Sequence, residues 1–328
     1  MNTAIYLDPL AIEQAIPDEK GWINYLGKLI DAVRSNMILF FDEDSRDLSI
    51  FKNRLYDLLS HPAGQRARIK FTEILKDKKQ KNRLRCFPTL HGQIKNPIFI
   101  ENQLPEALVI TENGKEPSHL QDKIVIFRSL IQYLDSDVEE NRLSYSNTIS
   151  PSSIEEFGSI FRKATRYSKD LSFYDPYAGR GINAKKYYKS IKLLLDIWLK
   201  SCQDCSKKMT IYSVFEENQF NSKVGKNLPF EKIKILLTED LLNPIKENYG
   251  VSVSVKMKKF EHTEDHDRFF ETDTGFFGMT RGFDILTDGG GLKNFSIYHP
   301  DKIKIAHLAA NWRLNCQDKF TISNSDIT

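Results

Sequence analysis

The sequence predicts an α/β protein of two domains, and three observations support this prediction. At 328 residues the chain is too long for one average domain. In both halves, short apolar runs typical of buried strands alternate with segments whose apolar residues recur at helical spacing. A polar, serine-containing segment at 135–153 separates the halves and has the composition of a linker. We therefore predict an N-terminal α/β domain over residues 1–140 and a second domain over residues 141–328.

The composition limits the class of protein. Hydrophobic residues make up 40% of the chain and aromatic residues 11%, which argues against global disorder. The net charge of +3, from 47 basic and 44 acidic residues, allows local basic patches but does not by itself indicate a polyanionic partner. There is no apolar run of membrane-spanning length and no signal-peptide layout at the start of the sequence. The cysteines fit reduced thiols better than a disulfide framework, so a cytoplasmic location is expected; they are Cys86, Cys202, Cys205 and Cys316.

The N-terminal half opens with the order β-α-β-α. A short buried strand is expected at 3–8, and helical spacing predicts a helix over 21–35. A second buried strand at 36–41 is followed by a helix that His61-Pro62-Ala63-Gly64 terminates. Further along, strands are predicted at 96–100 and 106–114, and a helix over 119–134.

Three acidic residues follow the first two strands, namely Asp8, Asp42 and Asp44. They could belong to a metal-dependent nuclease, but a hard-cation site needs several converging oxygens. An acid after a strand more often caps the next helix or lies in a turn. The capping interpretation is preferred, and no metal is predicted.

A basic amphipathic segment spans residues 66–85. Its apolar side chains are expected to face inward; they are Ile69, Phe71, Ile74 and Leu75. Lys78, Lys79 and Lys81 are candidates for phosphate contacts along a nucleic acid or another acidic surface. The alternative is a solvated helix end, where lysines also interact favourably with the helix dipole.

The C-terminal half has the order β-α-β-α-β-hairpin after an initial helix. The predicted helices are 153–168, a long segment carrying Ile191 to Trp198, and 230–250. The predicted strands end at Asp175-Pro176-Tyr177 and cover 209–215 and 251–260. Residues 292–300 are expected to add a strand, and 303–316 a docking helix or strand. This order predicts a mixed sheet flanked by helices.

The hairpin carries the most informative chemistry. Alternation places His266, Arg268, Phe270 and Thr272 on one face of a strand. Asp273-Thr274-Gly275 is the predicted turn, with Gly275 available for positive φ, and a second strand then leads toward Phe283. An imidazole and a guanidinium therefore lie side by side, with a carboxylate at the tip, which is a plausible phosphate site.

These residues resemble the phospholipase D superfamily signature, His-x-Lys-x4-Asp followed by a small glycine-containing turn. Here the pattern is His266-x-Arg268-x4-Asp273, with arginine in place of lysine and the glycine, Gly282, about two positions late. The run HDRFFETDTGFFGMTRGFDIL looks most like the phospholipase D-like domain at the C-terminus of MIT-domain proteins and of bacterial relatives. Those relatives carry the same His-x-Arg variant, so membership does not imply catalysis.

The resemblance implies roles for individual residues and requires neither a metal nor a cofactor. His266 would attack phosphorus, Arg268 would hold the phosphate oxygens and Asp273 would be the matching acid. Arg281 is assigned to phosphate binding as well. The chain contains one such motif, so catalysis would need a homodimer that pairs two copies of His266.

Two functions therefore follow from the resemblance. The first is a metal-independent nuclease or phosphodiesterase that acts on nucleic acid, as an effector of bacterial defence. The second is a catalytically silent module that binds nucleic acid, an anionic lipid surface or a protein partner. Arginine grips a phosphate bidentately and stays charged, so binding is expected to survive the replacement of lysine better than turnover.

Other readings of the same half remain open. Asp175 to Gly181 resembles the Gly-x-Gly cofactor loop of methyltransferases, in which Glu216 or Glu217 would hold a ribose of S-adenosylmethionine. His262, Glu264 and His266 share a strand face and are competent zinc ligands, or equally a polar strand face. Cys202-x2-Cys205 has the spacing of half a zinc site without a partner pair.

Overall fold

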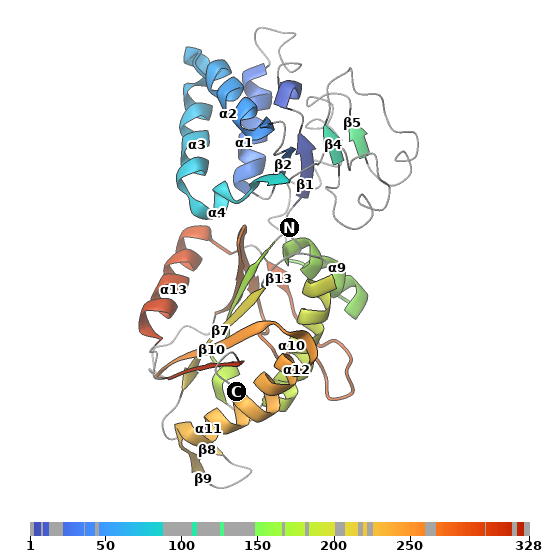
Figure 1. Cartoon of the computed structure of the whole chain (residues 1–328), viewed down its shortest axis with the longest axis vertical. Helices are drawn as coiled ribbons and strands as arrows, with labels where there is room; N and C mark the ends of the chain where they lie inside the picture. Colours follow the sequence, from blue (N-terminus) through green and yellow to red (C-terminus); the bar gives the residue numbers. More distant parts are fainter. Residues whose placement is uncertain are drawn as a thin grey trace. The chain divides into compact units, whose positions relative to one another are not determined.

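The structure is a computed structural model, and it forms two compact units, Met1–Tyr145 and Ser146–Thr328 (Figure 1). The described residues are 3–7, 9–12, 22–35, 37–42, 46–87, 107–109, 125–127, 148–165, 168–180, 184–200, 207–215, 219–221, 226–259, 267–298, 300–316 and 320–324. Most of the predicted linker, and the strand expected at 96–100, lie outside them.

The N-terminal unit contains a five-stranded sheet in the order β3-β2-β1-β4-β5, and every pairing is parallel. Its strands are β1 (Thr3–Leu7), β2 (Met37–Asp42), β3 (Leu84–Phe87), β4 (Ala107–Val109) and β5 (Val125–Phe127). The chain moves outward from β1 to β3 and returns to the other side of β1 for β4, which is the strand order of a doubly wound sheet. The helix predicted over 119–134 is wrong at its centre, because β5 occupies that position as an edge strand paired with β4.

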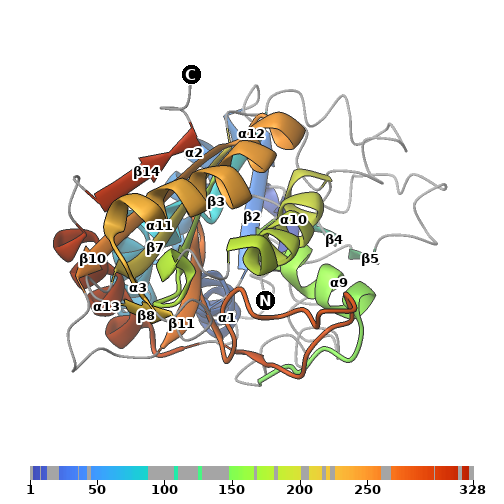
Figure 2. The ribbon, with the colours of Figure 1, turned by 90° about the horizontal axis from the view of Figure 1, so that it is seen from below.

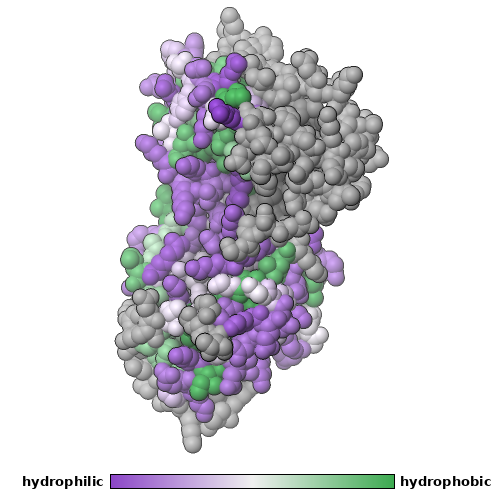
Figure 3. Space-filling view, viewed as in Figure 1, coloured by the Kyte–Doolittle hydropathy of each residue, from purple (hydrophilic) through white to green (hydrophobic). Residues whose placement is uncertain are grey.

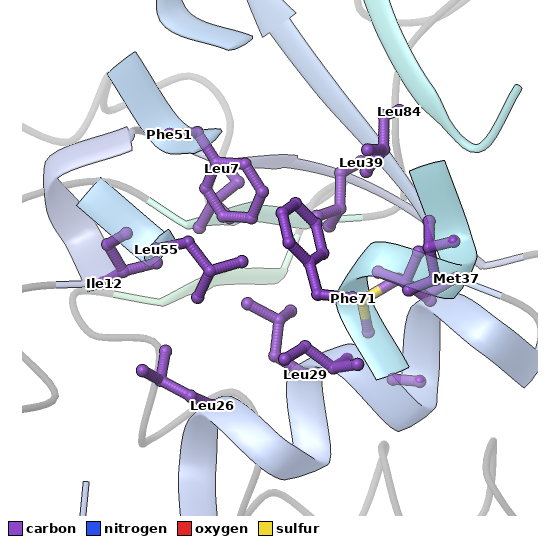
Figure 4. Close-up of a cluster of buried hydrophobic side chains, with 14 of the residues drawn as sticks. Leu7, Ile12, Leu26, Leu29, Met37, Leu39, Phe51, Leu55, Phe71 and Leu84 are labelled. Carbon is purple, nitrogen blue, oxygen red and sulfur yellow. The ribbon is translucent and has the colours of Figure 1, made fainter. Parts of the chain in front are cut away.

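Helices pack on this sheet through one hydrophobic cluster (Figure 4). The helices that contribute to it are the short η1 (Pro9–Ile12), α1 (Trp22–Ser35), α2 (Asp47–Leu58) and α3 (Gln65–Lys76). The short η2 (Pro62–Gly64) and α4 (Lys78–Lys81) belong to the same unit. Leu29 of α1, Phe51 of α2 and Phe71 of α3 meet Leu7 and Leu39 of the strands. The rings of Phe51 and Phe71 pack edge to face with centroids 6.1 Å apart.

One inward prediction in this unit is wrong. Ile69 is 56% exposed, whereas Phe71 and Ile74 are buried as expected. The buried positions of α3 are Ala67, Phe71 and Ile74, spaced four and three residues apart. Ile69 therefore lies about 200° around the helix from Ala67 and faces away from the sheet.

The C-terminal unit contains a seven-stranded mixed sheet in the order β13-β12-β11-β6-β7-β10-β14. Its strands are β6 (Asp170–Tyr174), β7 (Lys208–Phe215), β10 (Ser252–Lys259), β11 (Arg268–Thr272), β12 (Gly275–Met279), β13 (Ile297–Tyr298) and β14 (Thr321–Ser323). The central strands β6, β7 and β10 are parallel, and the remaining pairings are antiparallel. A separate two-stranded ribbon is formed by β8 (Gln219–Asn221) and β9 (Lys226–Leu228).

Helices cover both faces of this sheet (Figures 1 and 2). They are α9 (Ile154–Thr165), the short η4 (Ala178–Arg180), α10 (Ala184–Lys200), α11 (Phe230–Leu237), the π-helical η5 (Thr238–Leu242), α12 (Asn243–Tyr249) and α13 (Lys302–Asn315). Neighbouring residues of β6 show the two faces. Phe173 packs against Phe161 of α9, whereas Tyr174 packs against Trp312 of α13. The segment at 303–316, expected as a helix or a strand, is therefore a helix that lies on the sheet face opposite α9.

The predicted hairpin is formed by β11 and β12, which pair from Arg268 opposite Met279 to Thr272 opposite Gly275. Asp273 and Thr274 form the two-residue turn. Gly275 does not use the positive φ that the sequence predicted; among the described glycines only Gly250 and Gly290 have positive φ. The side chain of Thr272 instead accepts the Gly275 N–H at 3.1 Å, which holds the turn through a threonine hydroxyl.

No helix in the part of the chain that the structure describes is both long and apolar enough to cross a membrane. Hydrophilic side chains dominate the described surface seen in Figure 3, with small hydrophobic patches between them.

Candidate anion-binding site

The candidate site lies where the carboxyl end of β6 meets the start of β11. β11 is antiparallel to β6, with Phe269 opposite Tyr174. The next residue along β6, Asp175, is therefore brought to the first residue of β11, Arg268. The carboxyl ends of parallel strands are a common place for ligand sites in α/β sheets.

Asp175 is buried and its carboxylate is held by the backbone. Oδ1 accepts the Tyr177 N–H at 2.9 Å, and Oδ2 accepts the Phe283 N–H at 2.8 Å. Burial raises the pKa of Asp175, while these two N–H groups and the nearby Arg268 oppose the increase. The carboxylate thus fixes two loops, one after β6 and one after β12.

Arg268 is fixed by three different groups. Its Nε lies 3.9 Å from Oδ1 of Asp175, and Nη1 donates to the carbonyl oxygen of Thr280 at 3.3 Å. Its guanidinium carbon lies 4.8 Å from the centroid of the Tyr177 ring, in a cation–π contact. The side chain remains 25% exposed. This is a guanidinium with a defined orientation and a solvent-accessible portion.

Gly282 is required by the close approach of its backbone to both residues. A Cβ at this position would lie 1.8 Å from Oδ2 of Asp175 and 3.1 Å from Cδ of Arg268. No side chain fits there without displacing the carboxylate. The glycine in the phospholipase D-like pattern therefore has a specific packing role in this chain.

The side chain of Ser213, on the neighbouring strand β7, also fixes the loop after β6. The Ser213 hydroxyl donates to the Asp175 carbonyl oxygen at 2.7 Å and accepts the Gly179 N–H at 2.6 Å. A Cβ on Gly179 would lie 2.8 Å from Sδ of Met257. Protein atoms therefore fill the space next to Gly179. This close packing explains why a glycine is needed here, without the cofactor-loop interpretation. Gly181, Glu216 and Glu217 lie outside the described residues.

The structure does not bring Asp273 to Arg268. The two residues lie at opposite ends of β11, roughly 16 Å apart at about 3.3 Å per residue. Oδ2 of Asp273 accepts the Lys169 N–H at 2.9 Å, and the Asp273 N–H donates to the Ser168 hydroxyl at 3.3 Å. This carboxylate therefore joins the hairpin tip to the start of β6. His266, the predicted nucleophile, lies outside the described residues.

Arg281 lies beside the site and points its guanidinium at Asp284. Nη1 donates to Oδ2 of Asp284 at 3.3 Å, and Nε donates to the carbonyl oxygen of Asn294 at 3.0 Å. Two lysines, Lys186 of α10 and Lys293, also contact Asp284. The sequence pattern indicates Arg281 but not its partners, because three separated segments must fold together to bring them to it.

The other predicted phosphate contacts, Lys78, Lys79 and Lys81, belong to the N-terminal unit. They lie on the single turn of α4, which Asp77 caps by accepting the Gln80 N–H at 2.9 Å. Lys78 and Lys81 are exposed, and Lys79 is half-buried.

Among the described residues, no group of three or more His, Cys, Asp or Glu side chains could hold a metal ion. The residues of the two zinc interpretations, and Asp8 and Asp44, lie outside that part of the chain; Asp42 ends β2. Cys86 and Cys316 form no disulfide in the part of the chain that the structure describes.

Comparison with models of protein families, with characterised proteins and with solved structures finds no match to this chain.

Proposed function

We propose that the C-terminal unit is a phospholipase D-like module that recognises phosphodiesters through Arg268. The observation that carries this proposal is the way in which the guanidinium is held. A backbone carbonyl, an aromatic ring and a buried carboxylate fix it, while part of the side chain faces solvent. Among the described residues, no acceptor binds its second terminal nitrogen. A fixed, permanently charged fork is suited to binding two phosphate oxygens.

The arrangement of elements supports the same proposal. The resemblance implies a mixed sheet flanked by helices, and the C-terminal unit contains such a sheet. Here β11 carries Arg268 and pairs with β6 on one side and with β12 on the other. The glycine of the pattern, Gly282, packs directly against the Asp175–Arg268 pair.

Binding is the primary form of the proposal, and turnover is its extension. Turnover would make the protein a metal-independent nuclease or phosphodiesterase, with a role in bacterial defence as the corresponding hypothesis. It requires His266 as nucleophile and a second copy of the motif, supplied by a homodimer. Asp273 already serves the hairpin tip, so it is assigned no part in the chemistry.

The test of binding uses fluorescence anisotropy with labelled single-stranded DNA and RNA. We expect Arg268→Ala to weaken binding by about 10- to 100-fold, because a charge-assisted contact is worth about 1.5–3 kcal/mol. Arg162→Ala, which removes an exposed arginine of α9 in the same unit, is the matched control. Equal affinities of the Arg268→Ala variant and the wild type would refute the proposal.

The test of turnover is cleavage of the same substrates with EDTA present, comparing wild type with His266→Ala. If the wild type cleaves the substrate and His266→Ala does not, the result supports phosphohistidine chemistry. Binding without cleavage in both proteins identifies a silent module.

A further inference from the structure

We infer that the C-terminal unit contains a second phosphate subsite, formed by Lys186, Arg281 and Lys293 around Asp284, and that its ligand is a nucleic-acid strand. These four residues are called the cation cluster below. The inference rests on the proposed function, because the first phosphate of the strand is assigned to Arg268.

The cation cluster is held together by one carboxylate. Nζ of Lys186 lies 2.7 Å from Oδ1 of Asp284, and Nζ of Lys293 lies 2.6 Å from the same oxygen. Nη1 of Arg281 lies 3.3 Å from Oδ2. Although burial acts to raise it, hydrogen bonds from the two lysines hold the pKa of Asp284 below its usual range. The hydrogen bond to Asp284 also raises the pKa of Lys186, so the ammonium form is favoured.

The charges of the cluster do not balance. Three cations share one carboxylate, which leaves two positive charges; Asp288, whose charge also acts on Lys186, reduces the excess to one. The Lys186 and Arg281 side chains remain 40% and 45% exposed. Asp284 thus orders long cationic side chains before any ligand arrives, which lowers the entropic cost of binding an anion.

The cluster is adjacent to Arg268 because both are attached to the same short loop. Arg281 and Asp284 flank Gly282 and Phe283 in the sequence. The Gly282 backbone packs against Arg268, and the Phe283 N–H donates to Asp175. Arg268 contacts the middle of this loop at Gly282, and the cluster includes both of its end residues, so the two cationic sites are suited to neighbouring phosphates of one strand.

The surroundings favour a strand over a lipid surface. Amphipathic segments that lie in a membrane interface insert apolar side chains at the contact. The exposed large hydrophobic residues described in this unit are Ile235 of α11 and Ile303 and Leu314 of α13, so none belongs to the 281–284 loop or to the start of α10.

The experiment measures how the affinity for a labelled single-stranded oligonucleotide depends on salt. Each lost phosphate contact lowers the slope of log Kd against log[NaCl] by about 0.7. We expect this decrease, with about tenfold weaker binding, for Lys186→Ala and for Arg281→Gln. The matched control is Lys185→Ala, which changes the neighbouring lysine of α10. The Lys185 side chain is 84% exposed, and its Nζ lies 3.6 Å from Oδ1 of Asp240. Thermal melting verifies that each variant is folded, and agreement between two variants from different elements excludes a local folding defect.

A double variant separates the two subsites. If Arg268 and Lys186 hold different phosphates, Arg268→Ala and Lys186→Ala lower the slope additively, by about 1.4 together. If Lys186→Ala and Arg281→Gln behave like Lys185→Ala while Arg268→Ala still weakens binding, the second subsite is refuted and the proposed function stands. If Arg268→Ala has no effect, the proposed function fails. If Lys186→Ala and Arg281→Gln weaken binding to anionic vesicles but bind the oligonucleotide as tightly as the wild type does, the strand is refuted as the ligand.

Discussion

At the scale of single residues, Gly282 determines whether the Asp175–Arg268 pair can form. A methyl group there would lie 1.8 Å from Oδ2 of Asp175, so Gly282→Ala must displace either the carboxylate or the loop. We expect the variant to lose about 1–3 kcal/mol of unfolding free energy, the usual cost of overpacking. Urea denaturation monitored by circular dichroism measures this loss.

The chain offers a matched control for that substitution. Gly289 lies in the same region, has no heavy atom within 4 Å of the position of an added Cβ and does not have a positive φ. Gly289→Ala should therefore leave stability within about 0.5 kcal/mol of wild type. Equal effects of the two substitutions would contradict the close packing at Gly282.

Asp175 gives a second prediction, about pH. Its pKa is raised in the folded state, mainly by burial, so the folded protein retains this proton to higher pH than the unfolded chain does. The stability that the group contributes therefore falls as pH rises from about 4 through the folded pKa. Asp175→Asn removes the titration but also replaces an acceptor of one of two backbone N–H groups, at a cost of about 1–3 kcal/mol.

The measurement is the difference in unfolding free energy between wild type and Asp175→Asn from pH 3.5 to 7. We expect the advantage of the wild type to shrink as pH rises, because only the wild type loses the stability linked to this proton. An advantage that grows with pH would show that the folded state favours the carboxylate over the acid.

At the scale of elements, α13 is attached to the sheet by a few buried side chains. Trp312, Ile305 and Ala309 pack on Tyr174 and Phe269, and Arg313 bonds Glu271 and the Tyr174 hydroxyl. We expect Trp312→Ala to cost about 3–5 kcal/mol, the usual range for deleting a buried aromatic side chain. On the same helix, Leu314 is 81% exposed, and Leu314→Ala should change stability by less than about 0.5 kcal/mol. Similar denaturation midpoints for both variants would contradict this attachment of α13.

The hairpin, α13 and the segment at 119–134 show which elements the sequence pattern predicts and which it does not. The hairpin followed from alternation and from turn residues within one short stretch, and it is present as β11 and β12. In α13 apolar residues lie on both faces, with Ile303 exposed and Ile305 buried, so the sequence pattern did not distinguish a helix from a strand. The helix predicted at 119–134 is wrong where β5 pairs with β4, because an edge strand gains its stability from a partner strand and local spacing does not reveal that partner.

The site was predictable to a similar degree. Arg268 was identified from the motif, whereas the pairing of Asp175 with it was not. Asp175 accepts the N–H of Phe283, a residue 108 positions away, and only the strand order β11-β6-β7 brings them together. Asp273 was placed correctly at the hairpin tip, but its contacts with Ser168 and Lys169 depend equally on long-range pairing.

At the scale of the whole molecule, each unit has its own sheet and its own buried core. In the N-terminal unit the core lies between the parallel sheet and α1 to α3. In the C-terminal unit, helices cover both faces of the mixed sheet. A unit with an independent core is expected to fold without its neighbour.

The corresponding prediction is that residues 146–328, expressed alone, unfold cooperatively and bind the oligonucleotide through Arg268. Lys78, Lys79 and Lys81 are absent from this fragment. If those lysines contact phosphates in the full chain, the salt slope of the fragment is lower by about 2, at about 0.7 for each contact. A fragment that unfolds without a cooperative transition would show that the two cores depend on each other. A cooperative fragment with an unchanged slope would assign all the phosphate contacts to the C-terminal unit and leave the α4 lysines as a solvated helix end.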